Sequence, residues 1–133
     1  MGDRENSGRV LGVCSWSLRP ESPADLVAKV SATGCDAVQL ALDPIRRGDW
    51  DEAETFQRLD DAGIRVVSGM MEMAGEDYST IASIARTGGV RPDATWNTNM
   101  EAGEALAQIA GRRGITLVTF HAGFLPLDAG DAE

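Results

Sequence analysis

Side chains that build many familiar catalytic and metal sites are scarce in this sequence of 133 residues. It contains one histidine, His121, and two cysteines, Cys14 and Cys35, with no Cys-x-x-Cys pair. A zinc site or a disulfide framework is therefore not supported, and we expect free thiols in a reducing cytosol. A Ser-His-Asp triad or a thiol nucleophile likewise has no motif to support it.

The sequence also lacks nucleotide-binding and membrane signals. The stretch "SGMMEMAGED" contains two glycines without the G-x-G-x-x-G spacing, and no P-loop, G-x-S-x-G or H-E-x-x-H motif occurs. No apolar run approaches the ~20 residues that span a bilayer, and the first eight residues lack the apolar core of a signal peptide. We therefore expect a soluble, cytoplasmic chain that does not interact with a membrane.

Positive charge is in short supply. Twelve Lys and Arg stand against 21 Asp and Glu, which gives a formal net charge of −9. Long-range repulsion argues against nucleic acid and anionic membranes as partners of the surface as a whole. The pairs Arg46-Arg47 and Arg112-Arg113 could meet an anion, but solvated loop or helix-end positions explain them more simply.

Apolar runs that follow a glycine recur along the chain. "TGCDAVQLAL", "AGIRVVSGMM" and "RGITLVTFHAG" contain Gly34, Gly63 and Gly114 ahead of mostly β-favouring residues. A glycine in this place closes a preceding helix, and a run without in/out alternation is typical of a parallel strand buried on both faces. The earlier run "RVLGVC" supplies one more strand.

Capping patterns between these runs predict four helical starts. They lie at Ser22-Pro23, Asp49, Asp77 and Thr98, with Ile81 among the apolar residues of the short third helix and residues 88–97 forming an irregular connection. The resulting order is β-α-β-α-β-α-α-β. Alternating strands and helices with short connections predict an α/β fold with a parallel sheet and right-handed crossovers.

Four β/α units of roughly 30 residues are half of a (β/α)8 barrel of ~250 residues. We therefore predict a partial TIM barrel of about four strands over residues 9–133, preceded by a disordered segment, 1–8. The chain would then be the amino-terminal part of a longer barrel. The alternative is a small doubly wound domain that stops early, although such sheets normally have a fifth strand and a closing helix.

The strand segments resemble those of the xylose-isomerase-like TIM barrels, a family of sugar and sugar-phosphate isomerases and epimerases. The resemblance rests on "LGVCSWSL", "GCDAVQLAL", "GIRVVSGMM" and "GITLVTFHAGF" as strands one to four, and it covers residues 9–127. Many relatives read G-x-x-x-V-E-L in strand two, where this chain has Gln39. The family fold is a (β/α)8 barrel with a divalent metal at the carboxyl ends of its strands.

The resemblance implies a divalent metal (Mn, Mg, Co or Zn) in a complete protein. In the family its main ligands come from strands five to eight, which this chain lacks. No metal site is therefore expected from this chain alone, and activity would belong to a longer parent protein or a complementing chain.

Barrel active sites lie at the carboxyl ends of strands, and four side chains near those ends are candidates here. His121 is the candidate catalytic residue and could also bind a sugar hydroxyl, since a neutral imidazole exchanges protons near physiological pH. Glu72, Gln39 and Trp16 are candidate substrate-binding residues: a carboxylate, an amide that can hold a hydroxyl but is not a base, and a ring that can stack on a sugar. The non-functional alternatives are a structural role for His121, a solvated loop charge for Glu72 and core packing for Trp16.

These observations predict the substrate-positioning part of a metal-dependent isomerase or epimerase that acts on a sugar or sugar phosphate. The alternative is a non-catalytic α/β module, or a truncated remnant, that self-associates through its open sheet edges, with a homodimer as one form.

Overall fold

The computed structural model describes residues 10–124, in which four strands form one parallel sheet in the order β1-β2-β3-β4. The strands are β1 (Val13–Cys14), β2 (Ala37–Ala41), β3 (Arg65–Met70) and β4 (Val118–Thr119). The predicted parallel sheet is therefore confirmed. The expected disordered segment 1–8 lies outside the described residues.

The sequential strand order gathers the main helices on one face of the sheet. Each crossover moves the chain one strand in the same direction, and right-handed crossovers then place α2 (Pro23–Thr33), α4 (Glu52–Asp61) and α6 (Asp93–Arg112) on a common side. A doubly wound sheet reverses its strand order and carries helices on both faces. The structure thus excludes the doubly wound alternative and has the arrangement of a partial (β/α)8 barrel.

One hydrophobic core lies between these helices and the sheet. Side chains from β2 and from all three helices contribute fully buried residues to it, which are Leu26 and Val30 of α2, Val38 and Leu40 of β2, Leu59 of α4 and Leu106 of α6. The opposite face of the sheet is covered less. Cys14 pairs with Gln39, and Met70 pairs with Thr119, and all four side chains are only half-buried. The sheet therefore has a packed outer face and an open inner face.

The first two long helices begin on side-chain caps. Ser22 Oγ accepts a hydrogen bond of 3.1 Å from the Asp25 backbone N–H, with Pro23 in the first turn, as the sequence predicts. Asp51 Oδ1 accepts 2.7 Å from the Glu54 N–H, so α4 begins at Glu52. The predicted start at Asp49 was two residues too early, because Asp51 is the capping residue.

Two short helices occupy places where the sequence predicted strand or loop. The expected strand one, "LGVCSWSL", is strand only at Val13–Cys14, and Ser15–Leu18 forms α1. The buried Ser15 hydroxyl accepts 2.8 Å from the Ala41 N–H, which fixes α1 against the end of β2. Pro44 then opens α3 (Asp43–Arg46) directly after β2.

The third connection also differs from its prediction. Asp77 closes a turn on the Ser79 N–H, and Thr80 caps α5 (Ile81–Thr87), so the predicted start at Asp77 is early. Ile81, the first residue of α5, is 86% exposed.

The second helix of this connection, α6, begins at Asp93 behind Pro92. Thr98 therefore lies inside a helix that was predicted to begin there, and much of the segment read as irregular, 88–97, is helical. A proline before the first turn starts this helix without a side-chain cap.

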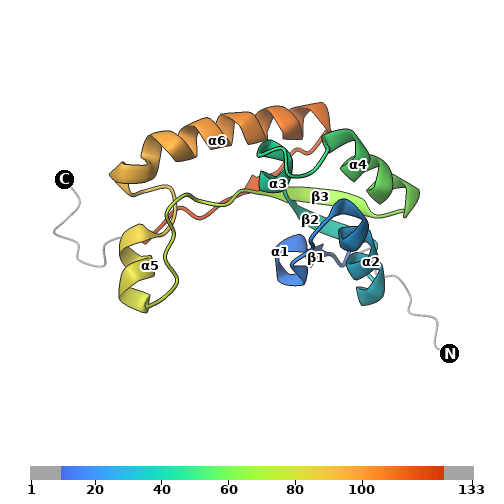
Figure 1. Ribbon diagram of the computed structural model, residues 1–133, viewed down its shortest axis with the longest axis horizontal. Coiled ribbons are helices and arrows are strands. Elements are labelled where there is room, and N and C mark those ends of the chain that lie inside the picture. Colours follow the sequence, from blue (N-terminus) through green and yellow to red (C-terminus); the bar gives the residue numbers. More distant parts are fainter. Residues whose placement is uncertain (1–9, 125–133) are drawn as a thin grey trace.

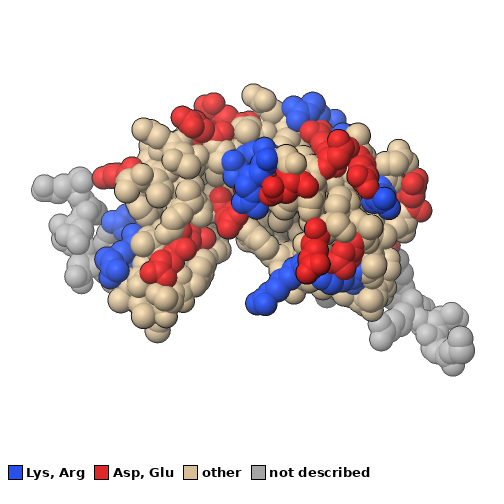
Figure 2. All heavy atoms as spheres, in the orientation of Figure 1, with Lys and Arg blue, Asp and Glu red and all other residues tan. Residues whose placement is uncertain are grey.

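The described residues form an arch (Figure 1). Helix α6 runs along its top, α5 hangs at one end, and α1, α2 and β1 form the other limb. In the space-filling view a deep notch separates the two limbs (Figure 2). Such an outline follows from a sheet that is packed on its outer side only.

Candidate functional site

A hollow of about 290 Å³ opens where the strands end. It is formed by the helix after β1, the end of β3, the loop after β3 and the second residue after β4. Its lining consists of Trp16, Met70, Met71, Glu72, Glu76, Tyr78 and His121. The carboxyl ends of parallel strands meet at one rim of a β/α fold, which is where barrel enzymes place their chemistry. We refer to this space as the rim hollow.

His121 is held at the rim hollow by a carboxylate. Its Nδ1 lies 3.1 Å from Glu76 Oε1 and 3.2 Å from the Tyr78 hydroxyl, which itself donates 3.0 Å to Glu76 Oε2. A carboxylate only accepts, so this geometry puts the ring proton on Nδ1 and leaves Nε2 of the neutral ring as an acceptor. The imidazole is therefore oriented, and its free nitrogen is suited to take a proton from a hydroxyl.

Glu76 is the fixed member of this cluster. Its side chain is only 10% exposed, against 56% for His121, and its Oε1 also accepts 2.9 Å from the Gly89 N–H. Gly89 has φ +80°, and an added Cβ would collide with the backbone of Gly123, so only glycine fits there. The residue between α5 and α6 thus anchors the carboxylate that orients the histidine.

The carboxylate of Glu76 also affects the pKa of Tyr78. Although the residue is 64% exposed, partial desolvation of its hydroxyl, together with the hydrogen bond and charge of Glu76, raises the pKa of Tyr78 above its ordinary value. At neutral pH the phenol is therefore firmly protonated and remains a donor to Glu76.

Trp16 lines the rim hollow from α1 and is 37% exposed. The buried hydrogen bond from Ala41 N–H to Ser15 Oγ holds the start of this helix, so the ring position is set by the residue before it. An exposed indole face at a rim can stack on the apolar face of a sugar.

Gln39 lies on the open inner face of the sheet and is not part of the hollow's lining. Its Nε2 donates 3.0 Å to Thr119 Oγ1, which links β2 to β4 across β3. The amide has a partner within the sheet, as a part-buried polar group requires. Its predicted role in substrate binding stays a prediction.

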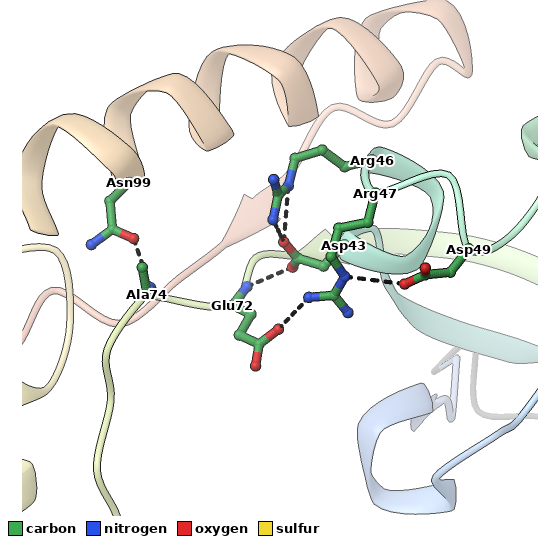
Figure 3. Close-up of polar contacts among 7 residues, drawn as sticks. All are labelled: Asp43, Arg46, Arg47, Asp49, Glu72, Ala74 and Asn99. Carbon is green, nitrogen blue, oxygen red and sulfur yellow. Dashed lines mark hydrogen bonds and ion pairs between the residues drawn. The ribbon is translucent and has the colours of Figure 1, made fainter.

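Glu72 stands between the rim hollow and an arginine network (Figure 3). Its Oε2 accepts 2.9 Å from Arg47 Nη1, and Arg47 Nε donates 3.2 Å to Asp49. Hydrogen bonding to Glu72, followed by that to Asp49, raises the pKa of Arg47. The carboxylate that the sequence offered as a sugar ligand is therefore already ion-paired.

A buried carboxylate supports this network from below. Asp43 is 1% exposed; its Oδ1 accepts from Arg46 Nε and Nη2 at 3.1 and 2.9 Å, and its Oδ2 accepts 2.7 Å from the Glu72 N–H. Both oxygens are satisfied, as a buried charge requires. Asp43 thereby ties the end of β2 to the loop after β3.

The residues at the rim do not fit a divalent metal. His121 and Glu76 supply one nitrogen and one carboxylate, and residues 10–124 contain no group of three or more His, Cys, Asp or Glu side chains that could hold an ion. Zinc sites take three or four protein ligands.

The sequence analysis did not identify Glu76, Tyr78 or the buried Asp43 as candidate site residues. His121 and Glu72 were identified because each lies close to a strand end. The same reasoning applies to Asp43, which follows Leu42 just after the end of β2. Glu76 and Tyr78 stand farther along the loop after β3, where sequence offers no measure of which side chains turn back to the rim.

The β/α units and the rim hollow define the class of fold as a partial α/β barrel. No family model and no curated protein matched the chain. A solved structure, the xylose isomerase domain protein from Planctomyces limnophilus, is similar with a TM-score of 0.66 and 23% sequence identity. The match covers 77% of this chain but only 36% of that one, so the chain has a partial xylose-isomerase-like fold.

Among the described residues no helix has the length and apolar character needed to cross a membrane.

Proposed function

We propose that this chain forms the substrate-positioning part of an isomerase or epimerase for a small sugar or sugar phosphate. The observation that carries the proposal is an imidazole, His121, held by Glu76 at the strand-end rim of a partial xylose-isomerase-like barrel. In this role His121 Nε2 exchanges a proton with a sugar hydroxyl while Trp16 packs against the ring.

The proposal extends to a divalent metal, Mn, Mg, Co or Zn, in the working enzyme. The carboxylate and histidine ligands would have to come from groups outside residues 10–124, because the described side chains do not form such a set. We propose further that the chain works in the cytoplasm, in keeping with its two free cysteines, and without nucleic acid, in keeping with its net charge of −9.

The test is a sugar titration of the ¹⁵N-labelled chain followed by NMR. The chain has three tryptophans, and Trp16 alone lines the rim hollow, so the Trp50 and Trp96 indoles are internal controls. Pentoses, hexoses and their phosphates should shift the Trp16 indole and the His121 ring resonances in a saturable way. Equal drift of all three indoles, or no shift at the rim, contradicts the proposal.

One variant distinguishes a hydrogen-bonding role of the His121 imidazole from simple stacking of an aromatic ring on the sugar. His121→Phe keeps an aromatic ring but removes Nε2, so the shift of Trp16 should weaken for sugars. Trp96→Phe, at an exposed ring outside the rim hollow, leaves His121, Glu76 and Tyr78 unchanged and is the control. A His121→Phe chain that binds as the unchanged chain does would leave the imidazole without a role.

A second candidate function is a module that completes itself by association. The described sheet has β1 and β4 at its edges, and its inner face is only half-buried. Leu117 and Phe120, which flank β4, are 56% and 53% exposed. Unpaired edges beside exposed apolar side chains favour pairing with another copy of the chain.

A further inference from the structure

The two edge strands of the sheet lack the residues that usually protect a free edge. Natural edge strands avoid pairing with another chain through charged side chains or proline. The segments through β1, residues 10–18, and through β4, residues 114–124, contain no Lys, Arg, Asp, Glu or Pro. The charges of this acidic chain therefore lie outside both segments, and neither edge carries a charge of its own that would repel a further strand.

Apolar side chains are exposed beside both edges. Val10 and Leu11, which precede β1, and Leu117 and Phe120, which flank β4, are each at least half exposed. Phe120 and Met100 of α6 also line an apolar cavity of about 370 Å³ next to β4. A strand added to either edge would remove part of this apolar surface from water, which favours pairing.

The inner face of the sheet is also suited to burial. Its half-buried side chains, Cys14, Gln39, Met70 and Thr119, carry no charge, and Gln39 already donates to Thr119. An eight-stranded barrel fills its interior with the side chains of this face. The described sheet supplies four strands of such a wall, and an identical sheet would supply the other four.

Strand direction decides which edges can meet. All four strands are parallel and follow one another in the order β1-β2-β3-β4. If the β1 of a second copy lies parallel to β4, half-turn symmetry lays the β4 of that copy parallel to the first β1, and the ring is closed. A symmetric contact between two β4 edges would instead be antiparallel and would put the two rims at opposite ends.

We infer that two copies of this chain close an eight-stranded barrel, in which the β1 edge of each copy pairs in parallel with the β4 edge of the other. This arrangement rests on the self-association proposed above and specifies its surfaces. β1 leads into α1 with Trp16, and β4 leads to His121. Closure therefore places Trp16 of the partner subunit after the strand adjacent to β4, so that each copy adds an aromatic ring to the rim of the other.

Sedimentation equilibrium of the full chain tests the closed arrangement. The average mass should rise with concentration and level off at twice the 14.1 kDa of one chain. Edges that pair without closing the ring would build longer assemblies, because a head-to-tail contact that does not close continues without limit. A mass that rises beyond two chains therefore contradicts the barrel.

Two variants charge one edge each: Leu11→Lys at β1 and Leu117→Asp at β4. Each alone should raise the dissociation constant of the dimer by at least about tenfold, because pairing would bury an unpaired charge. An equal mixture of the two variants should associate again, since one interface is then unchanged and the other joins the new ammonium to the new carboxylate. Both leucines are more than half exposed, so the variants should fold, which circular dichroism melts check. Ala53→Asp, at an exposed position of α4, is the control and should leave association unchanged.

Four results would overturn the inference: a constant monomer mass, a mass beyond two chains, association that persists in either single variant, or a mixture that stays monomeric. A constant monomer mass would also reject self-association itself, whereas the other three reject only this pairing of edges. The sugar response at Trp16 is a separate measurement, so the isomerase or epimerase proposal succeeds or fails independently of all four.

Discussion

His121 and Glu76 meet across 45 positions of sequence. The single histidine could be assigned to a strand end because the apolar, β-favouring run before it predicts a strand. Its partner could not, since Glu76 stands in a loop whose path depends on Gly89 and on the contact with Tyr78. At this scale the sequence indicates which groups have chemistry, and the tertiary fold decides which of them face each other.

Tyr78 permits a direct measurement of this cluster, because it is the one tyrosine in the chain. Its raised pKa means that the phenol titrates above its ordinary 10.0, since water loss and the Glu76 charge disfavour the phenolate. Glu76→Gln removes the charge but not the desolvation, so the midpoint should fall part of the way back. A spectrophotometric titration of the tyrosinate band measures the midpoint.

The matched control for this titration is Glu54→Gln. Glu54 pairs with Arg58 on α4 and makes no contact with Tyr78, so the tyrosine midpoint should stay where it is. An unchanged midpoint in the Glu76→Gln chain would mean that the carboxylate does not act on the phenol in solution.

Among the elements, caps and buried stripes were predictable and short helices were not. The Ser22-Pro23 pattern predicted the start of α2 correctly, because the capping hydrogen bond joins residues that are close in sequence. In contrast α1 and α3 are four residues each, and they exist because Ser15 and Asp43 find partners on other strands and loops. Local patterns hold no information on such contacts, so these helices were missed.

Alanine substitutions at two glycines, one in α6 and one in β3, should change the free energy of unfolding in opposite directions. An added Cβ at Gly111 of α6 meets nothing within 4 Å, so Gly111→Ala should raise the free energy of unfolding by about 0.5–1 kcal/mol. At Gly69 of β3 the Cβ would lie 2.6 Å from Leu42 Cδ1 in the core, so Gly69→Ala should lower it by about 1–3 kcal/mol.

Urea denaturation of the two variants beside the unchanged chain measures both changes. The pair is its own control, because each variant adds the same methyl group. Equal effects of the two substitutions would contradict the close approach of Leu42 to β3.

For the whole molecule, the order of strands was the prediction that mattered most. Alternating β and α runs indicated a parallel sheet, and the average length of a unit indicated a barrel segment. The one-directional strand order and the solved neighbour with a TM-score of 0.66 confirm that fold. The arginine network around Asp43 and Glu72 depends on how separate segments pack, and the hydrophobic periodicity of the sequence does not predict such packing.

The proposed self-association is a prediction at this scale. Sedimentation of the chain should show an average mass that rises with concentration, and Leu117→Asp should abolish the rise by charging the exposed flank of β4. Ala53→Asp places the same charge at an exposed position of α4, on the outer side of the sheet, and should not matter. A constant monomer mass for the unchanged chain would reject the association.

The one-sided core has a consequence for the stability of the chain. Cohesion resides in side chains such as Leu40 and Leu106 beneath the helices, whereas the inner face carries Cys14, Gln39, Met70 and Thr119, none of which anchors that core. Substitutions on the inner face should therefore lower the free energy of unfolding less than substitutions beneath the helices do.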